Sequence, residues 1–230
     1  MPRKPKDELK PRGLQGLSDK LIDNHFDVLY KGYVNKLNEI EESVKTVDMG
    51  AANPTYSVVR ELKKEEVFTT NAITLHEGYF ENMSPGGNRP TGAILELIER
   101  EWGSYEKWEA EFRALGLAAR GWVVLAFNWE DGHTHNYLTD IHSEAVWNCS
   151  PMMILDVYEH AYYLDYGAAR KGYIDAFFAN LDWGVVNKRI EQLRIIENGG
   201  AIRVFGTKVK IFSVDCPEDL KKVKRVYKFR

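Results

Sequence analysis

The feature that most constrains the fold is a pair of long segments with helical spacing, both placed ahead of any strand-like segment. Apolar residues recur at steps of three and four over 17–47, which predicts an amphipathic helix with Ser18 as its N-cap. A break at 50–54 follows, and we expect a second helix over 57–82 that is interrupted near Lys64. Two long helices with a short connection predict an α-hairpin.

Strand-like segments gather after the hairpin. Two shorter helices are expected within 91–118, on either side of Gly103. Strands are expected at 122–128, 135–141 and 151–155. Residues 157–198 have a helical pattern again, with a break at 171–172. Because the strands are clustered and the helices lie apart from them in the chain, the sequence predicts an α+β fold.

The chain divides into four parts on this interpretation. Residues 1–16 form an extended arm, 17–90 the α-hairpin domain, and 91–198 an α+β domain. Residues 199–230 form an additional tail, with a β-hairpin and a basic last helix. The basic residues of that helix are expected either to face solvent or to meet an acidic partner or a membrane surface.

Composition excludes several classes of protein. The 230 residues carry 31 basic and 34 acidic side chains, a net charge of −3, which argues against nucleic acid as the main partner. No apolar run reaches the roughly 18–20 residues of a membrane span, and no apolar stretch follows the charged N-terminus as in a secretory signal. The two cysteines, Cys149 and Cys216, form no disulfide framework, so we expect a reducing, cytoplasmic location.

Four side chains could form a metal site. Asp156 and His160 are four residues apart, and at the start of a helix they would project from one face about 6 Å apart. Alternatively, Asp156 is only an acidic residue stabilised by the dipole at a helix N-terminus, and His160 is only packed in the core. His25 and His76, each on an apolar helical stripe, are ordinary core histidines when taken singly. Together the four offer three nitrogens and one oxygen, a set suited to iron or manganese.

The other histidines and motifs carry less information. His133 and His135 flank a predicted turn and are expected at the surface, whereas His142 follows the second strand and is harder to dismiss. The sequence contains no phosphate-binding loop, dinucleotide-binding glycine pattern, nucleophile elbow or HExxH helix.

A specific motif then narrows the interpretation. Residues 155–166, LDVYEHAYYLDY, closely resemble the D-x-W-E-H-A-Y-Y signature of the iron/manganese superoxide dismutase family. Further blocks resemble that family in the same order: 24–38, 76–85, Gly121-Trp122 and Asp182-Trp183. The resemblance covers about residues 14–195.

The resemblance implies a fold, a centre and an activity. The family's fold is an α-hairpin followed by an α+β domain with a three-stranded antiparallel sheet. Its metal ligands match His25, His76, Asp156 and His160. The implied activity is disproportionation of superoxide to dioxygen and hydrogen peroxide by redox cycling of one iron or manganese ion per chain, in a homodimer or a homotetramer.

Residues outside the ligand set also match family positions. The implied roles are Tyr33 as the pocket tyrosine that relays protons, Trp122 and Tyr158 as aromatic walls, Arg170 as a basic residue near the entry, and Glu159 and Tyr163 as residues that cross the dimer interface.

The chain departs from the family pattern at three places. Leu29 stands where the family usually has a second helix-1 histidine at the gateway. Ala72 stands where iron-type members carry an outer glutamine, and His142 lies near the position of that glutamine in manganese-type members. We therefore expect His142 to be the hydrogen-bond partner of metal-bound solvent, with iron slightly favoured or both metals tolerated. The tail beyond residue 198 is the third departure.

Two other functions remain open at this stage. One is a redox metalloenzyme of the same fold that acts on peroxide or an organic substrate, since Leu29 alters the funnel. The other is a non-catalytic metal-binding or interaction protein whose tail is the working part.

Overall fold

The structure is a computed structural model that describes residues 2–197, except for the side chains of 191–197. The chain divides into a unit over 1–194, to which the features discussed below belong, and residues 195–230. The predicted hairpin and basic helix of 199–230 lie outside the described residues. The boundary at residue 90 between two domains stays a prediction.

The first helical segment begins where the sequence predicts and changes its geometry partway. Ser18 caps α1 (Asp19–Asp23) by accepting a hydrogen bond from the Leu21 amide. The chain then widens into a seven-residue π-helix, Asn24–Tyr30, and returns to α-geometry in α2 (Lys31–Val44). Such π-segments are rare in proteins, and those that occur are often at functional sites. This one carries His25.

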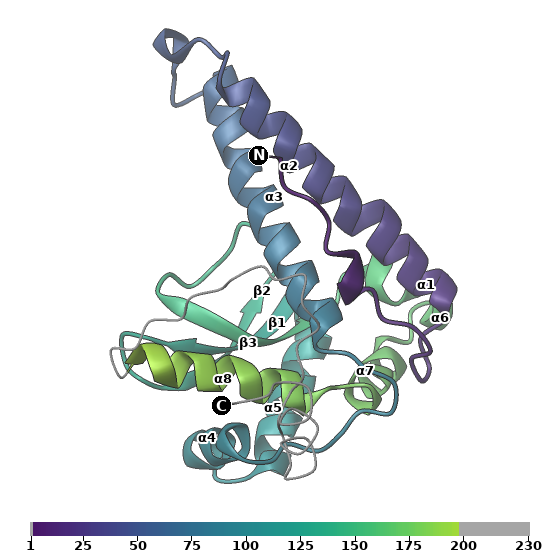
Figure 1. The fold of residues 1–230 in the computed structure, drawn as a ribbon. Helices are drawn as coiled ribbons and strands as arrows, with labels where there is room; N and C mark the ends of the chain where they lie inside the picture. The colour runs from purple at the N-terminus through teal and green to yellow at the C-terminus, as the bar shows by residue number, and fades with distance from the viewer. Residues whose placement is uncertain (1, 198–230) are drawn as a thin grey trace, which may run out of the picture. The chain divides into compact units, whose positions relative to one another are not determined.

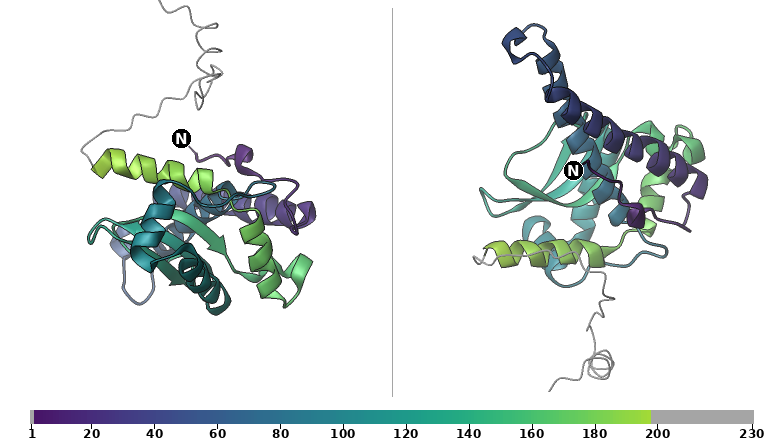
Figure 2. Two further views of the ribbon diagram at one scale, coloured as in Figure 1. Left: turned by 90° about the horizontal axis from the view of Figure 1, so that it is seen from below. Right: turned by 45° about the horizontal axis from the view of Figure 1, so that its top comes forward.

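The second helix of the hairpin is continuous. Helix α3 runs from Val58 to Glu81, so the expected interruption near Lys64 is wrong. The charged run there faces solvent and forms ion pairs one turn apart, Lys63 with Glu66 and Lys64 with Glu61. The views in Figures 1 and 2 agree that α2 and α3 lie side by side as a long antiparallel pair.

Three antiparallel strands form the sheet, in the order β2-β1-β3. Strand β1 (Trp122–Asn128) has the predicted ends, while β2 (Thr134–Thr139) stops two residues before the predicted end. Strand β3 (Cys149–Asp156) is longer than predicted and carries Asp156 as its last residue. The central strand β1 is buried except at Asn128, which confirms the α+β fold with its core on this sheet.

The remaining helices surround the sheet, as Figure 1 shows. Helices α4 (Ala93–Trp102) and α5 (Tyr105–Ala118) flank Gly103 as predicted. After β3 come a 3-10 turn (Glu159–Ala161), α6 (Tyr163–Tyr166), α7 (Arg170–Ala179) and α8 (Trp183–Glu197). The predicted break at 171–172 is wrong, because both residues lie inside α7. A Cβ on Gly172 would come within 3.1 Å of the Tyr166 ring, so this glycine serves packing.

Helix α3 lies unusually close to β3. A Cβ atom on Gly78 would collide with the Ile154 side chain, so the absence of a side chain at residue 78 permits this approach. His76 lies half a turn before Gly78, and Asp156 lies two residues after Ile154. Near this contact, Nε2 of His76 lies 3.7 Å from Oδ2 of Asp156 at the end of the sheet.

The N-terminal arm is tied to the hairpin. Its main chain is extended apart from a short 3-10 turn at Asp7–Leu9. Figure 1 shows the arm running alongside α2 and α3. The Arg3 amide donates to Asn38 and the Lys6 amide to the Tyr30 hydroxyl, so the arm is part of the packed structure.

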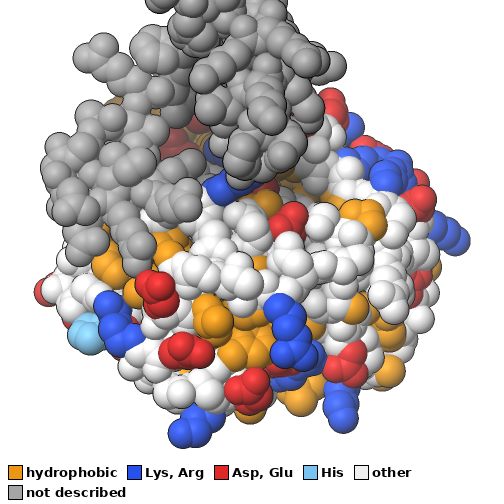
Figure 3. Space-filling view, turned by 60° about the horizontal axis from the view of Figure 1, so that its bottom comes forward, with side chains coloured by type: hydrophobic (Ala, Val, Ile, Leu, Met, Phe, Trp, Pro, Cys, Tyr) orange, Lys and Arg blue, Asp and Glu red, His pale blue; other side chains and the backbone are white. Residues whose placement is uncertain are grey.

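The surface mixes charges of both signs. On the part of the face visible in Figure 3, basic and acidic side chains are interspersed around small apolar areas. Within residues 2–197, no helix has the length and apolar character needed to cross a bilayer.

Candidate metal centre

Four ligand-type side chains from four different elements meet in the interior. They are His25 from the π-helix, His76 from α3, Asp156 from the end of β3 and His160 from the 3-10 turn. One ligand atom from each lies within 4.8 Å of all the others. His25, His76 and Asp156 are fully buried, so these groups are held by the fold rather than by solvent.

The Asp156 carboxylate is the hub of the cluster. Its Oδ2 atom lies 3.1 Å from Nε2 of His25, 3.1 Å from Nε2 of His160 and 3.7 Å from Nε2 of His76. Its Oδ1 atom accepts the amide of Tyr158, and its main-chain carbonyl accepts the hydroxyl of Tyr173. The second carboxylate oxygen is thereby fixed toward the three imidazoles.

The imidazole nitrogens fit a cation. His76 Nδ1 lies 2.7 Å from the Ala72 carbonyl, an acceptor only, so Nδ1 carries the proton and Nε2 presents a lone pair to the cluster. Nε2 of His25 and Nε2 of His76 are buried and face the Asp156 carboxylate, but among the described residues neither makes a hydrogen bond of good geometry. Buried polar atoms without a partner are costly, and a metal ion bound among them would satisfy both.

The electrostatics favour the protonation states that bind metal. Burial lowers the pKa of His25 and of His76, which keeps both rings neutral. Burial alone would raise the pKa of Asp156, but the charge and hydrogen bonds of the neighbouring imidazoles outweigh it and hold that pKa below its usual range. Burial would lower the pKa of His160, but the charge and hydrogen bond of Asp156 raise it, so this ring gives up a proton when a metal binds. Three imidazole nitrogens and one carboxylate oxygen then form a donor set that suits iron, manganese or zinc.

The local geometry of Asp156 and His160 differs from the prediction. The two residues were expected on one face at the start of a helix, but Asp156 ends a strand and His160 belongs to a 3-10 turn. The amide of Val157 bonds to the Gly121 carbonyl, which keeps the chain paired with the sheet past Asp156. The turn then carries His160 back, and its Nε2 hydrogen-bonds to the carboxylate.

His142 lies beside the cluster and has a defined tautomer. The indole nitrogen of Trp122, which can only donate, lies 2.9 Å from Nδ1 of His142. Nδ1 is therefore the acceptor, and a neutral ring carries its proton on Nε2. That Nε2 lies 3.1 Å from the Tyr33 hydroxyl oxygen, to which it donates. Burial lowers the pKa of His142 to about 4, so the ring is neutral near pH 7.

Aromatic rings enclose this group. The Trp122 ring lies 5.0 Å from that of His76, and the Tyr158 ring lies 5.1 Å from that of His142 and 5.3 Å from that of His160. The sequence interpretation missed Phe68, whose ring lies 4.6 Å from His142. Its position on α3, eight residues before His76, puts it near the same helix face and is the signal that could have found it.

Arg170 has a structural contact that the sequence does not predict. It donates to the carbonyls of Leu117 and Ala119 at the C-terminal end of α5, and to the Tyr162 hydroxyl. A cation at a helix C-terminus is stabilising because it meets unpaired carbonyls. Its predicted place near the entry stays a prediction.

The two predicted interface residues and Leu29 lie outside the buried cluster. Glu159 is exposed, and Tyr163 is 57% exposed. Leu29 is half-buried on the π-helix. Nearby positions in the chain are also apolar and exposed: Val28 and Leu164.

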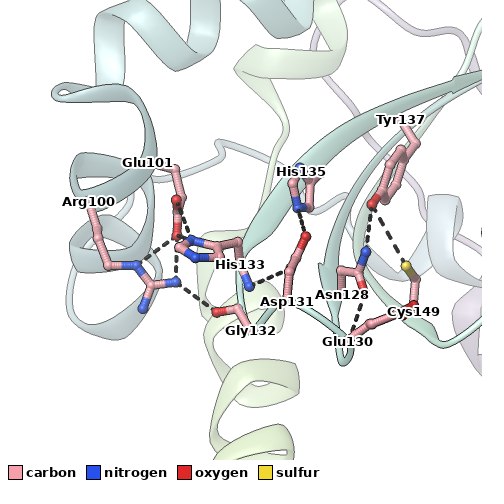
Figure 4. A network of polar contacts seen from close by, with 10 residues as sticks. All are labelled: Arg100, Glu101, Asn128, Glu130, Asp131, Gly132, His133, His135, Tyr137 and Cys149. Atoms are coloured by element: carbon pink, nitrogen blue, oxygen red, sulfur yellow. Dashed lines mark hydrogen bonds and ion pairs between the residues drawn. The ribbon is translucent and has the colours of Figure 1, made fainter.

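His133 and His135 are at the surface, as predicted. Figure 4 shows both in the turn region between β1 and β2. His133 Nδ1 lies 2.9 Å from Glu101, and His135 Nε2 lies 2.9 Å from Asp131. Neither belongs to the four-residue cluster.

Comparison with known proteins agrees with this geometry. Residues 90–189 match the family model described as iron/manganese superoxide dismutases, C-terminal domain. Superoxide dismutase [Fe] of Aquifex aeolicus is 43% identical, over 82% of this chain and 91% of its own. Superoxide dismutase [Fe] of Cupriavidus metallidurans is 41% identical, over 76% of this chain and 92% of its own. Superoxide dismutase [Mn] 1 of Halobacterium salinarum is 35% identical, over 81% of this chain and 90% of its own.

These alignments reach well beyond the C-terminal domain. Each of these relatives is covered over at least 90% of its length at 35% identity or more. The matched family model adds the domain that carries Asp156 and His160, two members of the buried cluster. The chain belongs to the iron/manganese superoxide dismutase family.

Proposed function

We propose that this protein is a superoxide dismutase that uses one iron or manganese ion per chain. The observation that carries the proposal is the buried cluster of three imidazoles and one carboxylate, in which Nε2 of His25 and Nε2 of His76 both point at the Asp156 carboxylate. The sequence similarity to enzymes named superoxide dismutase supports the reaction. Two superoxide anions and two protons then give one dioxygen and one hydrogen peroxide.

His25, His76, Asp156 and His160 would hold the ion. The bound metal supplies reversible one-electron chemistry. The chain contributes a water-poor site, since three of the four ligands are fully buried. Asp156 contributes the one negative charge of the set, which stabilises a more highly charged metal state. The His76–Ala72 and Asp156–Tyr158 hydrogen bonds orient two ligands from outside, and such bonds tune ligand basicity.

Iron is the favoured metal, with manganese as the alternative. The relatives named as iron enzymes are 41–43% identical to this chain, and those named as manganese enzymes are 35–36% identical. The donor set itself accommodates either ion.

Tyr33 and His142 would supply protons to the reaction. Because His142 donates its Nε2 proton to the Tyr33 oxygen, the phenol proton of Tyr33 is directed elsewhere and is free to be donated. Burial raises the pKa of Tyr33, so the phenol stays protonated at neutral pH. The chain thus holds an available proton at a fixed atom beside the cluster.

We also infer a homodimer, or a tetramer made from it, in the cytoplasm. The exposed Tyr163 and Glu159 lie next to His160, so an interface there would cover the edge of the centre. Val28 and Leu164, 63% and 49% exposed, would add apolar area. The cytoplasmic location is supported by the presence of only two cysteines.

The test is reconstitution with a single metal. Protein purified without added metal is loaded separately with iron and with manganese, and both metal content and superoxide dismutation are measured. We expect about one ion per chain and dismutation, highest with iron. Metal binding without dismutation would instead favour an altered redox role or an interaction role. Full activity with manganese and none with iron would overturn the iron preference.

A further inference from the structure

The main chain of His142 is held by a side chain from the hairpin. Asn71, half-buried on α3, donates from its Nδ2 to the His142 carbonyl oxygen at 2.8 Å. Among the described residues, this is the one hydrogen bond made to the main chain of His142. It joins the helix that carries His76 to the loop that carries His142.

The loop is also held by hydrogen bonds at Asp140, two residues before His142. The Asp140 carbonyl accepts the Tyr158 hydroxyl at 3.0 Å, and the Asp140 amide donates to the Glu144 carboxylate at 2.6 Å. The Asp140 side chain accepts the Arg120 amide. The Glu144 amide also donates to the Ile141 carbonyl, which closes a turn around residues 142–143. These contacts shape the loop locally, and the hydrogen bond from Asn71 ties the His142 backbone to α3.

Helix α3 and the end of the loop line a shared cavity. A cavity of about 210 Å³ separates α3 from the sheet and from residues 144–146 of the loop. Asn71 and Thr74 line it from the helix. Aromatic rings pack the side chain of His142, but its main chain has one hydrogen bond among the described residues, to Asn71, so this directed bond has a large share in setting the position of the His142 backbone.

The position of His142 matters because both ring nitrogens are engaged. Nδ1 accepts from Trp122 and Nε2 donates to Tyr33, at 2.9 and 3.1 Å. Hydrogen bonds weaken steeply with misalignment, so a small shift of the backbone would break one or both. Residue 72, the next on the helix, is a fully buried alanine and has no polar side chain to hold His142 in place of Asn71.

We propose that Asn71 is a positioning residue for His142: it holds the loop so that the imidazole bridges Trp122 and Tyr33 beside the metal centre. The inference rests on the proposed function for its catalytic consequence, but the positioning itself is a property of the metal-free chain. Asn71 touches neither the cluster nor the substrate and acts through His142.

The experiment compares Asn71→Leu and Asn71→Asp with the unaltered full-length protein. Both variants remove the donor at similar side-chain volume. Thr74→Val is the matched control: it lines the same cavity from the same helix, and its hydroxyl bonds only to the Thr70 carbonyl of its own helix. The first readout is the indole N–H resonance of Trp122 in the metal-free protein, identified among the six tryptophans by its loss in Trp122→Phe.

We expect the Trp122 resonance to move in both Asn71 variants and to stay in place in Thr74→Val. Metal content should be unchanged in all three. In the metal-loaded enzyme, the Asn71 variants should lose activity on the order of tenfold and show a displaced pH profile, because the Tyr33–His142 pair is disturbed.

Three results would overturn the inference. They are an unmoved Trp122 resonance with an unchanged pH profile in the Asn71 variants, equal effects in Thr74→Val, and loss of metal from the Asn71 variants. If the unaltered protein dismutates no superoxide with either metal, the proposed function fails. The resonance of Trp122 in the metal-free protein still decides whether Asn71 positions His142.

Discussion

Asp156 is the residue on which the centre depends most, because one of its oxygens faces three imidazole nitrogens. We predict that Asp156→Asn lowers metal content at least tenfold, since it removes the only negative charge of the donor set while keeping the shape of the side chain. Metal analysis after dialysis measures this. The fold should survive, because the amide can still hydrogen-bond to the Tyr158 amide.

The chain contains a matched control for that change. Asp131 and His135 are also four residues apart and in contact, but they lie at the surface, Asp131 exposed on the β1–β2 turn and His135 half-buried at the start of β2 (Figure 4). Asp131→Asn should leave metal content and activity unchanged. Equal metal content in Asp156→Asn and the unaltered protein would remove Asp156 from the ligand set.

Leu29 allows a second prediction at the scale of one residue. We expect Leu29→His to alter the rate or the pH profile of dismutation by a factor of about two to five, and to leave metal content intact. Leu29 is half-buried on the π-helix and is not a member of the cluster, so we expect a new imidazole there to leave the four ligands in place. Loss of metal from this variant would show that Leu29 supports the ligands directly.

At the scale of elements, the arm and the hairpin share a buried charge. Glu77, only 7% exposed, pairs with Lys6 at 2.7 Å and Arg3 at 3.3 Å and accepts the Tyr30 hydroxyl. We predict that Arg3→Met with Lys6→Met lowers the free energy of unfolding by about 1–2 kcal/mol, between the values of exposed and buried pairs. Urea denaturation of the metal-free protein measures it.

A double-mutant cycle separates this pairing from loss of packing. Adding Glu77→Gln to the Arg3, Lys6 variant should restore part of the stability, because no buried carboxylate is then left without a cation. Lys36→Met, which breaks an exposed pair with Glu39, is the control and should change stability by less than about 0.5 kcal/mol. Strictly additive losses in the cycle would contradict the coupling.

The elements also show where sequence patterns suffice and where they do not. Strand β1 has the predicted ends because a β-rich run stops at a turn, and Ser18 caps the first helix because its hydroxyl meets the free amides there. The charged residues around Lys64 and the glycine at position 172 look like helix interruptions in the sequence. The charged residues lie on a solvated face of a continuous helix, and Gly172 packs against Tyr166 inside another helix. Tertiary contacts decide such positions.

The candidate metal centre also has features that sequence patterns predict and features that they do not. The ligand set was identified through the family motif, because His25 and His76 alone are indistinguishable from core histidines. Asp156 and His160 were predicted to be near each other for the wrong reason, since a strand end followed by a 3-10 turn brings residues four apart together as a helix does. Asn71 and Phe68 contact His142 across a sequence separation of about 70 residues; helix spacing from His76 could indicate Phe68, but no local pattern indicates Asn71.

At the scale of the whole molecule, the fold buries an unusual number of phenols near one another. Tyr79 and Tyr173 are fully buried and hydrogen-bonded to each other, and Tyr30 is buried beside Glu77. Burial raises the pKa of Tyr30 and of Tyr158 to about 12, and it raises those of Tyr79 and Tyr173 further. All four are therefore protonated in the folded protein when the unfolded chain begins to ionise, at about pH 10.

These buried phenols make the stability of the folded protein depend on pH in alkali. Above about pH 10 the unfolded chain binds fewer protons than the folded one, so the free energy of unfolding falls as the pH rises, by about 1.4 kcal/mol per pH unit for each buried phenol. We predict a cooperative loss of structure in alkali, during which most of the phenolate absorbance appears together with the loss of circular dichroism. Tyr30→Phe should reduce the slope of stability against pH by about one proton. Tyr56→Phe, which alters a 70% exposed ring, is the control. A phenolate signal that is complete while the protein is still folded would show that these hydroxyls are open to solvent.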